Sequence, residues 1–335
     1  MSTRTVTNRR PLAFTDYLPL DFETVGLRAD VTQGLTATTK ALPPKWFYDK
    51  VGSELFEEIT RLPEYYPTRT ERRILHEHAR TLVETAAAGT IIELGSGSSE
   101  KTRLLLDALT ARSERLADRP GYIALDVSED ALRGACSALA DSYPTLRIEA
   151  LRADFTHQLD LLPESDRRLV VFLGSTIGNF EPVERAAFLS QVRAGLRPGD
   201  HFLLGADLVK PVDILVPAYD DAAGVTAAFN LNLLEVLNRR LGADFARADF
   251  EHRALWDDEH EWIEMRLRAR RAHTVTVPDL DLQVRFAAGE EMRTEISAKF
   301  RRDRLESELA AAGFSPAGWW SDPAEWFSLS LWAVE

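Results

Sequence analysis

The most informative residues of this 335-residue sequence are three carboxylates that each lie at the end of a predicted strand. Glu93 precedes a glycine-rich turn at residues 95–97, Asp126 ends the next strand, and Asp154 ends the strand after that, beside Phe155. Because the carboxyl ends of parallel strands meet at one edge of a sheet, we expect these side chains to lie close together. Such carboxylates can accept hydrogen bonds from ribose hydroxyls and an adenine amino group, so the pattern predicts a nucleoside site.

The turn itself has the residues of a nucleotide cradle. Gly95 and Gly97 lack a Cβ, so a ligand can lie against their backbone, and free N–H groups at the following helix start attract electron-rich atoms. The third glycine of a dinucleotide fingerprint would fall at Glu100, which disfavours a nicotinamide cofactor. Glu93 instead suits a cationic ligand without phosphates, such as S-adenosylmethionine. Two structural alternatives stay open: a plain tight connection, and acids that only cap the helices after them.

Five predicted strands alternate with helices around this turn. Their apolar stretches lie at residues 91–94, 122–126, 147–155, 168–179 and 201–208. This alternation predicts an α/β fold with a doubly wound, Rossmann-like parallel sheet that binds its ligand at the carboxyl ends of the strands. A helix at residues 302–312 and a hairpin through residues 318–331 are expected to complete this core.

The remaining sequence predicts a second, α+β lobe. Alternating apolar positions in residues 262–269, 274–286 and 291–300 are typical of antiparallel strands. We divide the chain into an N-terminal segment of residues 1–61 that contributes to substrate binding, a core of residues 62–210 and 298–335, and an inserted substrate-binding lobe of residues 211–297. Residues 1 to about 20 are expected to form a loose arm.

Composition disfavours several partners. The formal net charge of -13 argues against a nucleic-acid surface. No apolar run is long enough for a membrane span or a secretory signal, so we expect a cytoplasmic protein with no membrane partner. The sole cysteine, Cys136, fits a reducing compartment and a packing role. The neighbouring histidines His76 and His78 would point to different faces of a helix, so no metal site is expected.

Two polar segments have more than one interpretation. Prolines flank Tyr65 and Tyr66 and are expected to hold both tyrosines in an extended segment, where the rings either pack in the core or cover a pocket. Asn179 follows the fourth strand. Its amide could donate to a ligand carboxylate, or its side chain could cap the helix that starts nearby.

The predicted antiparallel strands are equally ambiguous. Glu295 and Ser297 are two residues apart and so share one face of a strand. There a carboxylate and a hydroxyl could address the two nitrogens of an imidazole, or they could simply face solvent. Met265 alternates with Ile263 and Leu267 and is expected in the core.

Longer segments resemble known families. The loop ELGSGS at 93–98, the strand-end acids and LRPGD at 196–200 resemble class I S-adenosylmethionine-dependent methyltransferases. More narrowly, four segments are similar to the histidine Nα-methyltransferases that begin ergothioneine biosynthesis in actinobacteria. These segments are LPPKWFYD at 42–49, TRLPEYYPTR at 60–69, FLGSTIGN at 172–179 and AYDDAAGVTAAFN at 218–230. The resemblance extends over about residues 30–335.

The resemblance implies a reaction and a set of site residues. The reaction is three successive methylations of the α-amino group of L-histidine, which give hercynine, with S-adenosylmethionine as methyl donor and no metal. By matching position, the catalytic residues fall at Tyr48, Gly174 and Asn179. Substrate contacts are implied at Asn179 and Tyr219 for the carboxylate, Tyr48 and Gly174 near the amine, Tyr65, Glu295 and Ser297 for the imidazole, and Met265 for the pocket wall. Cofactor contacts are implied at Gly95, Ser96, Lys101, Asp126, Asp154 and Phe155.

The chemistry of methyl transfer is consistent with these residue types. Transfer from a sulfonium is an in-line displacement, so positioning carries most of the catalysis. The amine must be deprotonated before each transfer, and the Tyr48 hydroxyl or a water could relay the proton. Two rival functions stay open: a class I methyltransferase that acts on another small amine, and a non-catalytic regulator that binds S-adenosylmethionine.

Overall fold

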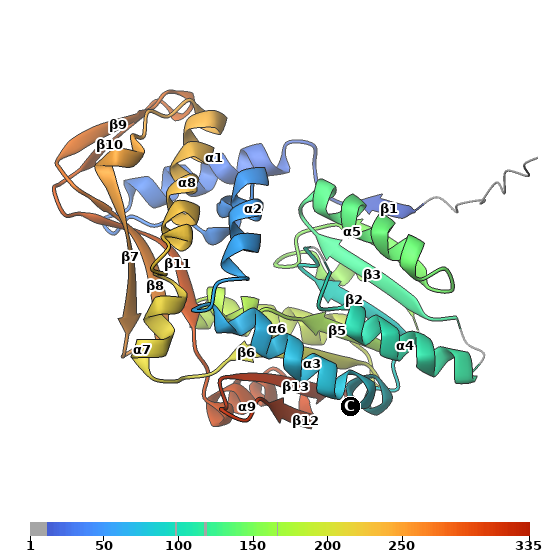
Figure 1. Cartoon of the computed structure of the whole chain (residues 1–335). Helices are drawn as coiled ribbons and strands as arrows, with labels where there is room; N and C mark the ends of the chain where they lie inside the picture. The colour runs from blue at the N-terminus through green and yellow to red at the C-terminus, as the bar shows by residue number, and fades with distance from the viewer. Residues whose placement is uncertain (1–11, 98, 117–118, 166) are drawn as a thin grey trace, which may run out of the picture.

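A mixed sheet with helices on both faces forms the larger part of the molecule (Figure 1). The computed structural model describes residues 12–97, 99–116, 119–165 and 167–335. Within these residues the largest sheet has eight strands in the order β1-β4-β3-β2-β5-β6-β13-β12. They are β1 (Ala13–Asp16), β2 (Thr90–Leu94), β3 (Gly121–Asp126), β4 (Arg147–Arg152), β5 (Arg168–Phe172), β6 (His201–Asp207), β12 (Ser315–Ser321) and β13 (Phe327–Ala333).

The strands from β1 to β6 run parallel to one another, and β13 and β12 add an antiparallel edge. Every residue of β2 and β5 is buried, as expected for central strands of a sheet that is covered on both faces. The predicted doubly wound α/β sheet is therefore confirmed, and the predicted C-terminal hairpin forms its antiparallel edge.

Helices cover the two faces of this sheet in two groups. The apolar residues of α3 (Tyr66–Thr85), α4 (Arg103–Leu116) and α5 (Glu129–Ser142) pack on one face. Those of α6 (Pro182–Gly195) and α9 (Arg302–Ala311) pack on the other. The prediction that Tyr66 is extended is wrong, because α3 begins at this residue and its proline falls in the first turn. There the missing N–H of proline leaves no helical hydrogen bond unmade.

A second lobe lies at the carboxyl ends of the central strands (Figure 1). Its strands are β7 (Phe250–Asp257), β8 (Trp262–Ala269) and β11 (Glu291–Ala298) in one antiparallel sheet, and β9 (His273–Val277) with β10 (Leu282–Phe286) in a hairpin. Helices α1 (Phe22–Thr36), α2 (Lys50–Ile59) and α8 (Val225–Leu241) pack with them around a common apolar core.

Two strand predictions in this lobe need correction. Strand β7 was not predicted, because only two of its eight residues are buried and the apolar alternation is weak. The single strand predicted over residues 274–286 is a hairpin instead. The chain reverses at a short 3-10 helix, Pro278–Leu280, which is followed by Asp281 in the left-handed region at φ 49°.

The N-terminal segment differs in part from its prediction. Residues 13–16 are not a loose arm, because β1 pairs with β4 and Asp16 forms an ion pair with Arg152 at 3.1 Å. Helices α1 and α2 belong to the core of the second lobe. The predicted segment of residues 1–61 thus contributes a strand to the large sheet and two helices to the second lobe, and its residues 1–11 lie outside the described part of the chain. The domain boundaries at residues 61, 210 and 297 stay a prediction.

Candidate active site

The glycine-rich turn after β2 has the backbone conformation that its residues predict. Gly95 and Gly97 have φ values of 67° and 47°, which residues with a Cβ rarely adopt. A Cβ at Gly95 would lie 3.4 Å from the ring of Phe155. Two predicted cofactor residues, Gly95 and Phe155, are therefore neighbours at the edge of the sheet.

Asp126 connects this turn to the end of β3. Its carboxylate accepts the backbone N–H groups of Gly97 and Ser128, each at 3.0 Å. Burial raises the pKa of Asp126, and the backbone hydrogen bonds oppose that effect. Because both oxygens are held by backbone, the carboxylate has a defined position at the edge of the sheet, as a ribose-binding group requires.

Asp154 belongs to the turn that follows β4. Its Oδ1 accepts the N–H of Thr156 at 2.8 Å, and its Oδ2 lies 3.1 Å from Nδ1 of His157. Burial acts to raise the pKa of Asp154, but the contacts with Thr156 and His157 outweigh burial and lower it. Asp154 stabilises its own turn and does not cap the helix after it, because the N-cap of the 3-10 helix Leu159–Leu161 is Gln158. Contact of Asp154 with a ligand stays a prediction.

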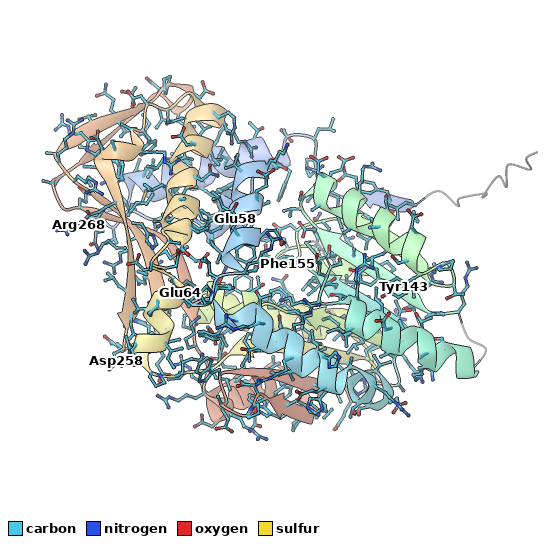
Figure 2. The ribbon with its side chains drawn as sticks, in the orientation of Figure 1. Glu58, Glu64, Tyr143, Phe155, Asp258 and Arg268 are labelled. Atoms are coloured by element: carbon cyan, nitrogen blue, oxygen red, sulfur yellow. The ribbon has the colours of Figure 1, made fainter. Side chains whose placement is uncertain are left out.

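Phe155 lies between the central sheet and the second lobe, as Figure 2 shows. One side of its ring packs against Phe172, with ring centroids 5.4 Å apart at a steep angle. Because Gly95 lies nearby, the ring is held at the mouth of the turn. This position suits an aromatic residue that flanks an adenine.

Ser96 and Lys101 differ in their surroundings. Ser96 Oγ is buried and has no hydrogen-bond partner among the described residues. Lys101 forms an ion pair with Glu71, a fully buried residue of α3. The same carboxylate accepts the N–H of Gly174, whose φ is 75°, at 2.8 Å. Glu71 therefore joins a predicted cofactor residue to a predicted catalytic residue. The sequence analysis missed it, because an acid within a charged amphipathic helix resembles a solvated residue.

The buried Glu93 precedes the glycine-rich turn and forms hydrogen bonds within the protein. Its carboxylate accepts the hydroxyl of Tyr122 at 2.6 Å and the hydroxyl of Thr102. Burial raises the pKa of Glu93 to about 7, although these hydrogen bonds act to lower it. Both carboxylate oxygens are thus engaged by protein hydroxyls, so the structure gives Glu93 a structural role and not the cation-binding role that its position suggested.

Asn179 ends a short 3-10 helix, Thr176–Asn179, which follows β5. A Cβ at Gly178 would lie 2.7 Å from the carbonyl oxygen of Ala298, so this helix packs directly on the end of β11. The N-cap of α6 is Glu181, so the alternative role of Asn179 as a helix cap is excluded. Among the described residues, nothing forms a hydrogen bond with the Asn179 amide, which lies beside the strand that carries Glu295.

Aromatic rings from distant segments form a row in the second lobe. The ring centroids of Tyr48 and Phe56 lie 5.6 Å apart, those of Phe56 and Tyr65 6.2 Å, and those of Tyr65 and Tyr219 6.2 Å. Tyr48 is 45% exposed, whereas Tyr219 is 6% exposed. The structure thus brings the three predicted tyrosines together, with Phe56 as a ring that sequence analysis missed.

The hydroxyl of Tyr65 lies among other polar groups of the site. Burial raises its pKa well above the ordinary value, and Tyr219, Tyr48 and Glu295 raise it further through their charges. Of these residues, Tyr219 is in ring contact with Tyr65, and Glu295 is near enough to act on it electrostatically. At neutral pH the Tyr65 hydroxyl keeps its proton and can serve as a hydrogen-bond partner.

Glu295 and Met265 are paired across β11 and β8, directly after a bulge in β11. Directly opposed residues of an antiparallel pair have neighbouring side chains, so the buried Met265 forms an apolar wall beside the carboxylate. Burial raises the pKa of Glu295 to about 7, and the charge of Lys299 opposes this shift. Among the described residues, none donates a hydrogen bond to the Glu295 carboxylate.

Ser297 and Tyr219 meet at a buried lysine. Their hydroxyl oxygens lie 2.8 Å apart, and Nζ of Lys299 donates to both at 2.8 Å. Lys299 also pairs with Asp207 at 2.9 Å. Sequence analysis missed Lys299 and Asp207, although each had a signal. Lys299 continues the period-two pattern of residues 295 and 297, and Asp207 ends a central strand as Asp126 does.

A groove of about 370 Å³ reaches the substrate side of the site. Asn179 and Glu295 line it from the central sheet and β11, and α1 with residues 37–44 forms the opposite wall. Two predicted substrate residues therefore border a space that is open to solvent.

Two kinds of feature are missing from the described ranges. They contain no group of three or more histidine, cysteine, aspartate or glutamate side chains arranged to hold a metal ion. They also contain no helix with the length and apolar character needed to cross a membrane.

Comparisons with known proteins find similarity to histidine methyltransferases over nearly the whole chain. A family described as "histidine-specific methyltransferase, SAM-dependent" matches residues 27–334. A histidine N-alpha-methyltransferase of Mycolicibacterium smegmatis is 55% identical over 320 residues, which are 96% of this chain and 98% of the relative. Another, from Mycobacterium tuberculosis, is 50% identical over 316 residues, 94% of this chain and 97% of the relative. Ergothioneine biosynthesis protein 1 of Neurospora crassa is 30% identical over 287 residues, 84% of this chain and 32% of that longer protein.

Proposed function

Because the chain belongs to the family of histidine-specific methyltransferases that depend on S-adenosylmethionine, we propose that it methylates the α-amino group of L-histidine three times. The product of three transfers is hercynine, the trimethylated betaine of histidine. This reaction is the first step of ergothioneine biosynthesis, and the names of the bacterial and fungal relatives support that assignment.

The observation that carries this proposal is the environment of Glu295. Its carboxylate lies beside the apolar wall of Met265 and within electrostatic reach of Tyr65, and within the described part of the chain it has no donor. An imidazole N–H supplies such a donor at the end of a flat ring. A substrate without that N–H would leave a desolvated carboxylate unpaired, which is a strong basis for discrimination.

We place the substrate so that its three polar groups meet three parts of the site. The carboxylate lies at Asn179 and Tyr219, and the imidazole lies at Tyr65, Glu295 and Ser297. The α-amine then lies between Tyr48 and Gly174, on the side of the cofactor turn. Support comes from two contacts: Glu71 binds the N–H of Gly174 and pairs with Lys101, and Gly178 packs against the end of β11.

The predicted cofactor residues fit S-adenosylmethionine on two observations. Ser96 Oγ is buried without a partner among the described residues, and Gly95 and Gly97, both at positive φ, leave the backbone of the turn without a covering side chain. When bound, this co-substrate supplies a methyl carbon that its sulfonium already activates, so the proposed reaction needs no metal. In this proposal the cofactor contacts are Gly95, Ser96 and Lys101 at the turn, Asp126 at the ribose, and Asp154 with Phe155 at the adenine.

The amine must lose a proton before each transfer, because its lone pair attacks the methyl carbon. Burial raises the pKa of Tyr65 and Tyr219, so these hydroxyls stay protonated and orient the substrate. Burial of the hydroxyl raises the pKa of Tyr48 as well, so in this proposal Tyr48 keeps its own proton and relays the proton of the amine to a neighbouring water. The faces of Tyr48 and Tyr65 also suit the methylated ammonium, at about 0.5–2 kcal/mol each.

Mass spectrometry of the reaction products tests this function. Purified protein is incubated with S-adenosylmethionine and each amino acid in turn. We expect one, two and three added methyl groups on histidine and none on the other amino acids. Transfer to another amine would keep the cofactor assignment and overturn the substrate, and no transfer to any amino acid would favour a protein that only binds S-adenosylmethionine.

A further inference from the structure

Lys299 and Lys210 both form ion pairs with the buried Asp207, and Lys299 also contacts the predicted substrate residues Tyr219 and Ser297. Nζ of Lys299 lies 2.9 Å from Asp207, and the two side chains are 0% and 1% exposed. Nζ of Lys210 lies 2.5 Å from the same carboxylate and its side chain is 2% exposed. Tyr66 also donates its hydroxyl to Asp207, at 2.7 Å. These described contacts place two ammonium groups on a single carboxylate.

Stability alone does not require the second lysine. In a buried ion pair, the attraction between two opposite charges roughly offsets the free energy that their desolvation costs. A second buried ammonium adds a further desolvation cost without a carboxylate of its own. Asp322 acts on Lys210 from a greater distance. However, the Asp322 carboxylate is engaged by N–H groups of its own loop, at Ala324 and Trp326, and by Arg73. One lysine would be enough to neutralise Asp207.

The two lysines differ in what else they contact. Besides Asp207, Lys210 donates to the Tyr66 hydroxyl at 2.8 Å and to the carbonyl oxygen of Leu208. Lys299 donates instead to Tyr219 and Ser297, each at 2.8 Å. A lysine ammonium has three N–H donors, so Asp207, Tyr219 and Ser297 use all three of Lys299.

The geometry also limits the hydroxyl hydrogens. Tyr219 and Ser297 each have one hydroxyl hydrogen, and their oxygens lie within hydrogen-bond distance of each other. Since Lys299 can only donate, both oxygens accept from it, and one hydroxyl donates to the other. One hydroxyl hydrogen is therefore left to point away from the cluster.

We propose that Lys299 is a positioning residue of the substrate site, which fixes the direction of the Tyr219 and Ser297 hydroxyls so that one of them donates to the substrate. This inference rests on the proposed function. Lys299 is fully buried and acts through the two hydroxyls, while Asp207 holds its ammonium in place.

The arrangement has a consequence for specificity. When Tyr219 donates to the substrate carboxylate, Ser297 gives its hydrogen to Tyr219 and keeps a lone pair. That lone pair accepts one N–H of a protonated imidazole, and Glu295 accepts the N–H of the other ring nitrogen. A ring with no N–H toward Ser297 would then face an oxygen lone pair, so Lys299 contributes to the recognition of histidine without touching it.

The first test compares Lys299→Met with Lys210→Met. Each variant removes one ammonium and leaves Asp207 paired with the other, so both make the same change in buried charge. We expect Lys299→Met to raise the KM for histidine by about tenfold, because the hydroxyl pair loses its orientation. Its affinity for S-adenosylhomocysteine should stay unchanged. Lys210→Met should change the KM for histidine by less than about twofold. Equal effects of the two variants would contradict the proposal.

The second test repeats Lys299→Met in a Tyr219→Phe/Ser297→Ala background. Histidine affinity is measured by calorimetry in the presence of S-adenosylhomocysteine, and thermal melts show which variants are folded. If Lys299 acts through the two hydroxyls, the substitution should weaken histidine binding by less than about twofold in this background. If Lys299→Met weakens histidine binding as much in this background as it does in the otherwise wild-type protein, the proposal is overturned. If Lys299→Met does not fold, Lys299→Gln is used in the same comparison.

The same experiments separate this inference from the proposed function. Wild-type protein is assayed for methyl transfer to histidine in parallel. No transfer by the wild type would overturn the function, whereas transfer combined with equal losses in both backgrounds would overturn only the role of Lys299.

Discussion

On the cofactor side of the site, Asp126 and Asp154 are held by backbone N–H groups: Asp154 by Thr156 of its own turn, and Asp126 by Ser128 of its own turn and by Gly97 of the turn after β2. On the substrate side, Glu295 and Asn179 make no side-chain hydrogen bond within the residues that the structure describes. The first arrangement is largely local, since each acid accepts an N–H from the residue two positions after it, and the additional donor to Asp126, Gly97, belongs to the turn of the neighbouring strand. The second leaves polar groups of the protein available to a ligand or to solvent. The comparison indicates that the cofactor half is shaped by turn chemistry and the substrate half by contacts between distant segments.

The largest expected effect comes from removing the unpaired carboxylate of the substrate half. We expect Glu295→Ala to lower kcat/KM for histidine by about tenfold or more, because the imidazole N–H loses its acceptor. Steady-state kinetics at several histidine concentrations measure this change. Glu291→Ala is the matched control, since Glu291 lies on the same strand but pairs with Arg266 at 2.6 Å. Unchanged kinetics of Glu295→Ala would remove this residue from the substrate site.

A second substitution tests the cofactor half. Asp126→Ala removes the acceptor that holds the turn at Gly97 and that we assign to the ribose. We expect the affinity for S-adenosylhomocysteine to fall by about tenfold, with thermal melts that still show a folded protein. Calorimetry measures the affinity, and Asp130→Ala on the exposed face of α5 serves as control. Equal affinities of the two variants would contradict the assignment.

The cofactor half was largely predictable from the sequence. The glycines at 95 and 97 need a positive φ, and buried parallel strands have to end at one sheet edge, so the positions of Asp126 and Phe155 follow from short segments. Short segments give a wrong prediction at Tyr66, which is expected to be extended because the proline after it resembles a helix breaker. In the structure this proline lies in the first turn of α3. The prediction is also wrong at residues 13–16, because nothing in so short a segment indicates that it will pair with β4.

The substrate half could not be derived from local patterns. Tyr48, Tyr65, Tyr219 and Glu295 come from four segments, and none of them has a neighbour in sequence that specifies its partners. The resemblance to a known family located these residues, but it did not locate the supporting residues. Asp207 and Lys299 each had a weak signal in the sequence, but only the structure shows that Asp207 pairs with both Lys210 and Lys299.

A smaller effect is expected where the two halves meet. Glu71→Gln keeps an acceptor for the N–H of Gly174 but removes the charge that pairs with Lys101. We expect the free energy of unfolding to fall by about 1–2 kcal/mol, because a buried charge-assisted contact is lost. We also expect S-adenosylhomocysteine binding to weaken by about threefold. Urea unfolding and calorimetry measure the two effects. A loss of stability with unchanged cofactor affinity would show that Glu71 does not couple the halves.

The smallest expected effect is a dependence of stability on pH. Burial raises the pKa of Glu295 from 4.5 to about 7 in the folded protein. The protonated form therefore favours the folded state, and this stabilisation is full below pH 4.5 and is lost as the pH rises through 7. Glu295→Gln lacks this dependence. Without ligand, its Tm relative to the wild type should rise by about 1–3 °C between about pH 5 and about pH 8. A constant difference in Tm would show that Glu295 titrates normally.

The most direct test of the whole account is a crystal structure of the protein with S-adenosylhomocysteine and histidine. We expect the imidazole within hydrogen-bond distance of Glu295 and Ser297, the carboxylate at Asn179 and Tyr219, and the α-amine facing the sulfur of the cofactor beside Tyr48. A histidine bound with its imidazole toward the cofactor, or bound away from β11, would contradict Nα-methylation at this site.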